Sequence, residues 1–190
     1  MPPSAPLTVR LGRMGDGRAL AELQDIANEG QLSNGLWKGD DWVGIGSAQI
    51  ERGTTEMGFA NTIVAERGDE VVGMLNFVRN DRAGLRLTDD PVAMPFIALR
   101  RALGTCIYLR AMAVLPEARG EGIAARLLDL CESVAANEGS PLGVIVHEGN
   151  ERLIAHYRSR GYRDVATERV LEHHGYPIGS ELIALLRDSS

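Results

Sequence analysis

The sequence is poor in cysteine and has no excess of basic charge. Its two cysteines, Cys106 and Cys131, lie far apart without the spacing of a metal site. They predict neither a disulfide framework nor a zinc centre, and we expect two buried, reduced thiols.

Twenty lysines and arginines stand against 26 aspartates and glutamates, which gives a formal charge of -6. This balance argues against a nucleic-acid partner, which would favour a basic surface, and is mildly compatible with a cationic substrate.

Long hydrophobic runs are absent as well. The longest, residues 91–99, is far shorter than the ~20 residues that a membrane helix needs. Residues 1–7 lack the basic stretch and apolar run of a secretory signal. We therefore expect a cytoplasmic protein without a membrane partner. The 190 residues are 44% hydrophobic and 24% charged, which is typical of one folded domain spanning residues 1–190.

Segments that alternate polar and apolar residues are interleaved with segments of helical periodicity. Their order predicts a mixed sheet with helices on both faces, in an α/β or α+β layering. Residues 82–103 are less regular, and we interpret them as an insertion or as the rim of a substrate site. Strands are predicted at residues 7–11, 61–66, 70–78, 107–114, 141–147, 162–171 and 181–186, and helices at residues 17–29, 40–52, 98–103, 120–137 and 150–160.

The turn after residues 107–114 carries the clearest chemical signal. Pro116 cannot extend the strand, and Gly120 and Gly122 let the main chain come close to a ligand. The next helix begins with main-chain N–H groups that have no partner inside the helix, and its dipole is positive at this end. Together with Arg119, these donors predict an anion site suited to a diphosphate.

The same helix is expected to pack one face on the sheet, because its apolar residues recur at helical spacing. The predicted stripe consists of Ile123, Leu127, Leu130 and Val134.

Two other interpretations of the glycine turn remain open. The glycines serve only a tight connection, or the segment 120–125 is the G-x-G-x-x-A fingerprint of a dinucleotide fold, with Glu148 after the next strand. The spacing counts against the second, because five residues separate the strand from Gly120 here. A nucleotide P-loop is excluded more firmly, since no Lys-Ser or Lys-Thr follows the glycines.

Two motifs in this half of the chain resemble those of the GCN5-related N-acetyltransferases (GNAT family). That family has a strand ending in Ala-Val-x-Pro, then Arg/Gln-x-x-Gly-x-Gly/Ala, and later an Asn before a helix that ends with Tyr, Gly and an aromatic residue. Together the two motifs cover about a third of the chain. The matching residues are Ala113, Val114, Leu115 and Pro116, then Arg119, Gly120, Glu121, Gly122, Ile123 and Ala124, and then Asn150, Tyr157, Gly161 and Tyr162.

The resemblance implies a mostly antiparallel sheet of about six to seven strands and an acetyltransferase that uses acetyl-coenzyme A, without a metal. It implies that the main chain of Met112, Ala113 and Val114 pairs with the pantetheine arm. By the same resemblance, the residues from Arg119 to Ala124 (Arg119, Gly120, Glu121, Gly122, Ile123, Ala124) hold the pyrophosphate, Asn150 bonds the pantetheine end, and Tyr157 reaches the sulfur.

Chemistry supports a role for Tyr157, although a structural role competes with it. A departing thiolate needs a proton or a strong hydrogen bond, and a phenol of pKa about 10 supplies either without ionising first. On helical spacing Tyr157 stacks above Leu153, so a half-buried core tyrosine is the alternative. Asn150 is equally suited to capping the helix, a role that does not exclude cofactor binding.

The residue that removes a proton from the amine is not evident. Histone-type members carry a glutamate early in the central strand, where this chain has Tyr108. Water, or His147 with Glu148 beside it, is a candidate, and an ordinary histidine at a strand end is the alternative. Asp40 and Asp41 are suited to attracting an ammonium group, but helix capping is favoured for them. A metal site at His173 and His174 is disfavoured, because adjacent side chains in an extended chain diverge.

Two functions follow from these residues. The first is an N-acetyltransferase in which a small-molecule or protein primary amine attacks the thioester directly, with a main-chain N–H near Val114 stabilising the oxyanion. The second is a coenzyme A-binding sensor or interaction module that has lost catalysis. Intact Tyr157 favours the first, and the missing glutamate keeps the second open. A homodimer is possible, because dimers are common among proteins of this kind.

Overall fold

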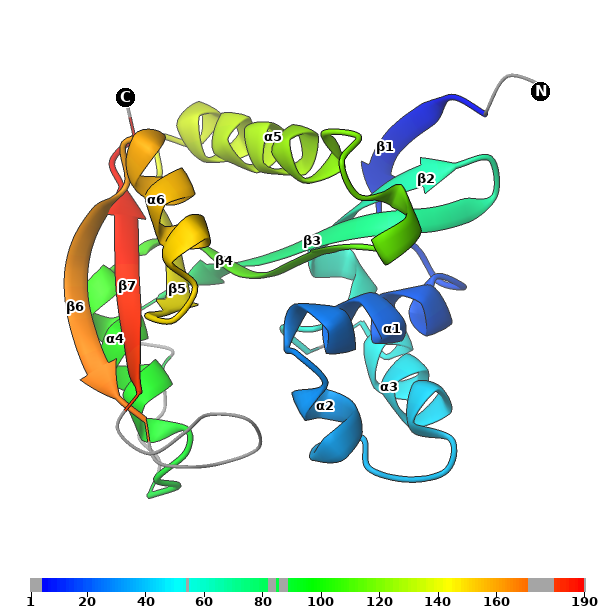
Figure 1. Ribbon diagram of the computed structural model, residues 1–190, viewed down its shortest axis with the longest axis horizontal. Helices are drawn as coiled ribbons and strands as arrows, with labels where there is room; N and C mark the ends of the chain where they lie inside the picture. Colours follow the sequence, from blue (N-terminus) through cyan, green and yellow to red (C-terminus); the bar gives the residue numbers. More distant parts are fainter. Residues whose placement is uncertain (1–4, 54, 82–84, 86–88, 171–179, 190) are drawn as a thin grey trace. The chain divides into compact units, whose positions relative to one another are not determined.

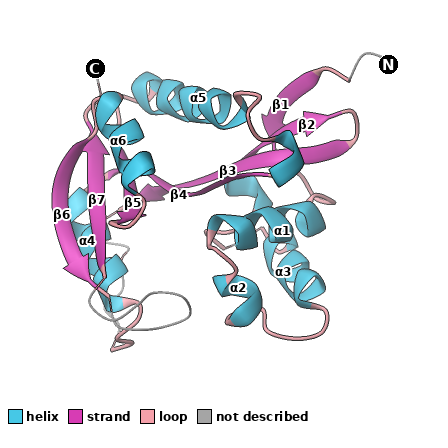
Figure 2. Ribbon diagram, viewed as in Figure 1, coloured by secondary structure: helices cyan, strands magenta, loops and turns pink. Residues whose placement is uncertain are grey.

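The computed structural model describes residues 5–53, 55–81, 85, 89–170 and 180–189. These residues form a seven-stranded, mostly antiparallel sheet with the strand order β1-β2-β3-β4-β5-β7-β6 (Figures 1 and 2). The strands are β1 (Leu7–Leu11), β2 (Thr62–Arg67), β3 (Glu70–Asn80), β4 (Cys106–Val114), β5 (Leu142–His147), β6 (Arg163–Arg169) and β7 (Glu181–Arg187). The helices are α1 (Gly17–Ala27), α2 (Gln31–Asn34), α3 (Trp42–Glu51), α4 (Met94–Leu103), α5 (Ile123–Asn137) and α6 (Glu151–Ser159).

The chain divides into two compact units, and the strands β3 and β4 and the helix α5 contribute to both. The first unit contains residues 1–77 and 111–131, and the second contains residues 78–110 and 132–190. In the second unit, β4 and β5 are parallel where Ile107–Leu109 face Leu142–Val144. The pairs β1–β2, β2–β3, β5–β7 and β6–β7 are antiparallel.

The hairpin of β2 and β3 turns at Gly68, whose φ of 60° lies in the left-handed region that favours glycine. Farther along, Ala65 faces Gly73 but Glu66 faces Val71, so Val72 is an extra residue in β3. The extra residue changes the alternation of side chains. As a result Val71 and Met74 both lie in the same core cluster.

Helices cover both faces of the hairpin in the first unit. Leu20 of α1 and Ile50 of α3 are fully buried in one cluster with Val64 and Met74. On the other face, a Cβ placed on Gly73 would lie 3.0 Å from the Cγ2 atom of Ile123, the first residue of α5. The layering predicted from the sequence is therefore confirmed, and Gly73 is small because α5 approaches closely.

An ion-pair network joins β1, β2 and the start of α1. The Arg10 guanidinium lies 2.7 Å from Asp16 Oδ2 and 2.8 Å from Glu66 Oε1. Burial opposes ionisation of Asp16, but hydrogen bonds from Arg10 and from the Arg13 N–H hold its pKa below the ordinary value. The hydrogen bond from Arg10 likewise lowers the pKa of Glu66.

In the second unit, α4 packs against β5, β6 and β7. Leu99 and Leu103 are buried in one cluster with Cys106 and Tyr108 of β4. Asn80, also buried, donates to the main-chain oxygens of Arg100 at 2.8 Å and Gly104 at 2.6 Å, which ties α4 to the end of β3. The sequence pattern predicted only residues 98–103 as helix and did not place them on the core.

Several other boundaries differ from the sequence predictions. The short helix α2 was not predicted, because four residues carry no periodic signal. Tyr162 precedes β6, which begins at Arg163, and the predicted end of that strand at residue 171 lies outside the described residues. Within the described part of the chain, every helix is too short or too polar to cross a membrane.

Candidate active site

The turn that follows β4 closes with local main-chain hydrogen bonds. The Leu115 N–H donates to the Val72 oxygen of β3 at 2.9 Å, which joins the start of the turn to the sheet. Pro116 then begins a 3-10 turn to Ala118, and the Ala118 N–H donates back to Leu115 at 3.0 Å. Because the Ala118 methyl group is buried, the chain turns sharply and exposes the residues that follow.

The glycines of this turn adopt a backbone conformation that other residues rarely take. The φ angles of Gly120 and Gly122 are 84° and 77°, whereas φ of Glu121 between them is not positive. Alternation of this kind makes successive N–H groups converge on an anion, as in main-chain nests. No atom lies within 4 Å of a Cβ placed at either glycine, so the space above the loop is open.

Helix α5 begins at Ile123, not at Gly120 as the sequence pattern predicted. The reason is that the left-handed conformation of Gly120 and Gly122 cannot continue a right-handed helix. The first main-chain hydrogen bond of this end runs from the Arg126 N–H to the Gly122 oxygen at 3.1 Å. The N–H groups before it lie at the free N-terminus of α5, where helix geometry gives them no intrahelical acceptor.

The predicted apolar stripe of α5 was partly wrong. Ile123 and Leu127 are buried, but Leu130 is 40% exposed and Val134 is only partly buried. Spacing by three residues from Leu127 led to Leu130, whereas a spacing of four defines the face that is covered. The buried residues are Ile123, Leu127, Leu128, Cys131 and Ala135.

Two charged side chains of the turn have definite partners. The Arg119 Nε donates to the Val114 oxygen at 3.2 Å, so its guanidinium lies across the turn that it closes. The Glu121 carboxylate forms an ion pair with Arg67 at the end of β2. Sequence reasoning missed Arg67, because the two residues lie 54 positions apart and no local pattern connects them.

The segment of the second motif lies in the second unit and is built around α6. The Asn150 Oδ1 accepts from the Leu153 N–H at 3.3 Å, which confirms the predicted N-cap. Tyr157 is 2% exposed, and its ring meets that of Tyr162 edge to face, with centroids 5.0 Å apart. The ring is thus more buried than the half-buried tyrosine considered as the alternative, and it shares the inner face of α6 with Ile154.

Neither His147 nor Glu148 stands out as the base that removes the proton, and Tyr108 occupies the place of the family's glutamate. Tyr108 is 7% exposed, and Arg100 Cζ lies 5.0 Å from the centre of its ring. His147 accepts from the Gly149 N–H through Nδ1 at 3.1 Å, which places the proton of the neutral ring on Nε2. Its main-chain oxygen accepts from Asn150, so the residue shapes the turn into α6. Glu148 accepts from the Glu181 N–H at 2.8 Å.

The remaining sequence candidates have structural roles where the structure describes them. Asp41 caps α3 by accepting from the Gly44 N–H at 3.0 Å, and Asp40 beside it is exposed. Both cysteines are buried thiols outside any disulfide, as expected, and burial raises the pKa of the Cys106 thiol to about 11. His173 and His174 lie outside the described residues, which contain no group of side chains suited to a metal.

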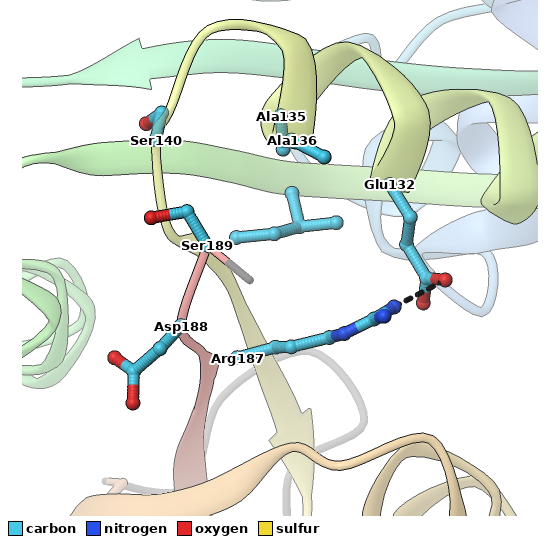
Figure 3. A pocket seen from close by; sticks show the side chains of 8 residues that line it. Glu132, Ala135, Ala136, Ser140, Arg187, Asp188 and Ser189 are labelled. Atoms are coloured by element: carbon cyan, nitrogen blue, oxygen red, sulfur yellow. Dashed lines mark ion pairs between the residues drawn. The ribbon is translucent and has the colours of Figure 1, made fainter.

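Each unit also has a hollow of its own. In the first unit an open groove of about 340 Å³ lies beneath the turn at Leu115, with Asp16, Glu22, Asp69 and Glu70 on its walls. In the second, a cavity of about 20 Å³ lies between the end of α5 and the end of β7, where Glu132 pairs with Arg187 (Figure 3). That is room for about one water. None of the predicted site residues lines either hollow.

The predicted site residues therefore form two groups. The first unit brings together the end of β4 and the glycine turn. The second unit holds the cap and the inner tyrosine of α6. The first group is Met112, Ala113, Val114, Arg119, Gly120, Glu121, Gly122, Ile123 and Ala124, and the second is Asn150 and Tyr157.

Comparisons with solved structures agree on the fold. An acetyltransferase crystal structure is 20% identical, with a TM-score of 0.69, over 96% of this chain and 100% of that one. An N-acetyltransferase from Staphylococcus aureus Mu50 is 17% identical, with a TM-score of 0.69, over 94% and 99%. The ribosomal-protein-S18-alanine N-acetyltransferase from Escherichia coli is 14% identical, with a TM-score of 0.61, over 97% and 95%.

At the level of sequence, no curated protein matches significantly. The family described as "Acetyltransferase (GNAT) family" matches residues 21–162, which include both motifs and well over half of the chain. The seven-stranded sheet and the glycine turn at the start of α5 accord with that match. This chain therefore belongs to the GNAT family of acetyltransferases.

Proposed function

We propose that this protein transfers an acetyl group from acetyl-coenzyme A to a primary amine, either a small molecule or a protein amino group, by direct attack. The observation that carries the proposal is the turn at residues 119–122. Its glycines have positive φ on either side of Glu121, the alternation by which main-chain nests gather N–H groups around an anion, and the space above it is open. Main-chain donors at a helix N-terminus are suited to a diphosphate.

The end of β4 would hold the pantetheine arm by main-chain hydrogen bonds. Since the Leu115 N–H donates toward β3, the N–H of Val114, one residue earlier, points away from β3. That direction supports Val114 as the donor to the oxyanion that develops during attack, where a fixed N–H dipole is effective. The Val114 oxygen accepts from Arg119, which keeps this end of the strand in place.

Tyr157 would act as the proton donor to the departing sulfur, and Asn150 would bond the pantetheine end. The thioester supplies a good leaving group, so no covalent intermediate on the protein is needed. Packing of Tyr157 against Tyr162 leaves its ring few rotamers, which favours a defined position of the hydroxyl. Proton removal from the amine is assigned to water, because Tyr108 is buried against Arg100 and Nδ1 of His147 is engaged.

A panel of amines tests the proposal. Purified protein is mixed with acetyl-coenzyme A and each amine, and the free thiol released is measured against a no-amine blank. We expect thiol release that depends on the amine and requires Tyr157. Binding of acetyl-coenzyme A by calorimetry with no turnover across the panel would instead favour the sensor module, and no binding at all would contradict both.

A further inference from the structure

A carboxylate stands in the middle of the turn that is proposed to hold the diphosphate. Glu121 lies between Gly120 and Gly122, and its side chain is 46% exposed. A negative charge at this place opposes an anionic ligand, because like charges at short range repel. The main-chain donors alone therefore do not describe the electrostatics of the turn.

Arg67 compensates this charge from another element of the first unit. It is the last residue of β2, its side chain is 25% exposed, and its Nη2 forms the ion pair with Glu121 Oε2. A planar guanidinium suits a carboxylate and remains charged at every physiological pH. The pair thus compensates the charge of Glu121 and connects the turn to the sheet.

The hairpin fixes the direction of Arg67. Successive side chains of a strand point to opposite faces, and Glu66 points to the α1 face, where it bonds Arg10. Arg67 accordingly points to the face that α5 covers. It pairs in register with Glu70 across a tight turn at Gly68, which limits the movement of its main chain.

We infer that Arg67 is a positioning residue for the diphosphate of acetyl-coenzyme A, acting through Glu121. Arg67 neutralises Glu121 and holds it against the hairpin. The partial positive charge of the N–H groups of the turn is then not opposed by Glu121 when the diphosphate binds. This inference rests on the proposed function, and it adds a residue that belongs to neither family motif. Removing Arg67 should weaken ligands that carry the diphosphate and spare those that lack it.

The test compares two ligands and three variants by calorimetry. For acetyl-coenzyme A, Arg67→Ala should raise Kd about tenfold, whereas Glu121→Gln should bind at least as tightly as the wild type. The double variant Arg67→Ala/Glu121→Gln should return close to the wild-type Kd, because the uncompensated carboxylate is gone. For S-acetylpantetheine, which has no diphosphate, Arg67→Ala should leave Kd unchanged.

A matched control removes a cation elsewhere in the same unit. Arg52 is exposed at the end of α3, a helix packed on the other face of the hairpin, and Arg52→Ala should leave both Kd values unchanged. The inference is overturned if the double variant binds as weakly as Arg67→Ala, or if Arg67→Ala weakens both ligands equally. If the wild type bound no acetyl-coenzyme A, the proposed function itself would fail, and this inference with it.

Discussion

The two family motifs lie in the glycine turn before α5 and in the segment around α6. The proposed role of the turn depends on its main-chain atoms, whereas that of α6 depends on its side chains. In the turn the main chain is the proposed binding group, and the glycines matter for their positive φ and the open space above them. In α6 the side chains matter, and each also serves the fold: Asn150 caps the helix, and Tyr157 fills the core. A motif of main-chain geometry thus has few competing explanations, whereas a motif of side chains has a structural alternative at each position.

The largest effect should come from breaking the turn. Gly122→Glu forces a side chain into a left-handed conformation and adds a carboxylate beside the proposed diphosphate site, so Kd for acetyl-coenzyme A should rise about a thousandfold. Calorimetry measures this change. Gly139→Glu is the matched control, because Gly139 also has a positive φ, 61°, and an open Cβ position, but lies just beyond α5. An unchanged Kd for Gly122→Glu would refute the placement of the diphosphate.

The next effect should separate the chemistry of α6 from its packing. Tyr157→Phe keeps the buried ring and removes only the hydroxyl, so kcat should fall about a hundredfold while Kd for acetyl-coenzyme A stays the same. Tyr162→Phe is the control, since it removes a hydroxyl that donates to Glu132 at 3.2 Å from the neighbouring ring. Steady-state kinetics with thiol detection measures both variants. Equal losses in the two would assign Tyr157 to packing alone.

A smaller effect compares the ion networks of the two units. In Glu132, burial raises the pKa, but hydrogen bonds from Arg160 and Arg187 outweigh it and lower the pKa, as those to Asp16 do in the first unit. A lowered pKa means that the stabilisation is present above the ordinary carboxylate value and is lost as the pH falls through the folded one. Asp16→Asn or Glu132→Gln should therefore cost about 2 kcal/mol at pH 7 and make stability less sensitive to acid.

Urea unfolding between pH 7 and pH 3 checks this expectation for both variants. Asp188→Asn breaks the exposed pair with Arg163 and should change the free energy of unfolding by less than about 1 kcal/mol. A loss for Asp188→Asn as large as the other two would show that burial of the networks is not what makes them matter.

The smallest effect tests the double role of Asn150. Asn150→Ala should lower stability by about 1 kcal/mol through loss of the cap, and Asn150→Ser should restore it. If Asn150 also bonds the pantetheine arm, both variants should raise KM for acetyl-coenzyme A, because serine is too short to reach the ligand. Restoration of KM together with stability in Asn150→Ser would leave Asn150 as a cap only.

The elements with strong periodicity or special backbone residues were predictable from the sequence. β1 was placed at its observed bounds, and β4, β5 and β7 within one residue at each end. The cap at Asn150 follows from a local hydrogen bond that one side chain makes to its own helix. The start of α5 was missed by three residues, because glycine permits a helix as well as the left-handed turn that it forms here.

Contacts between residues far apart in the chain could not be predicted from the sequence. The pairing of Arg67 with Glu121, the placement of Arg100 over Tyr108 and the packing of α4 on the core have no local signature. Each depends on which elements become neighbours in the sheet, and that is settled by burial of the whole core rather than by any segment.

What the sequence by itself determined is the motif chemistry: two glycines, an arginine, an asparagine and a tyrosine at family spacing, on alternating strands and helices. Only the tertiary structure decided that the carboxylate of Glu121 is balanced by Arg67, that Tyr157 is buried rather than half exposed, and that Leu130 faces solvent. Local hydrogen bonds and backbone preferences act within a few residues, and they can therefore be predicted from the local sequence. Charge compensation and burial act between elements, so they exist only once the chain has folded.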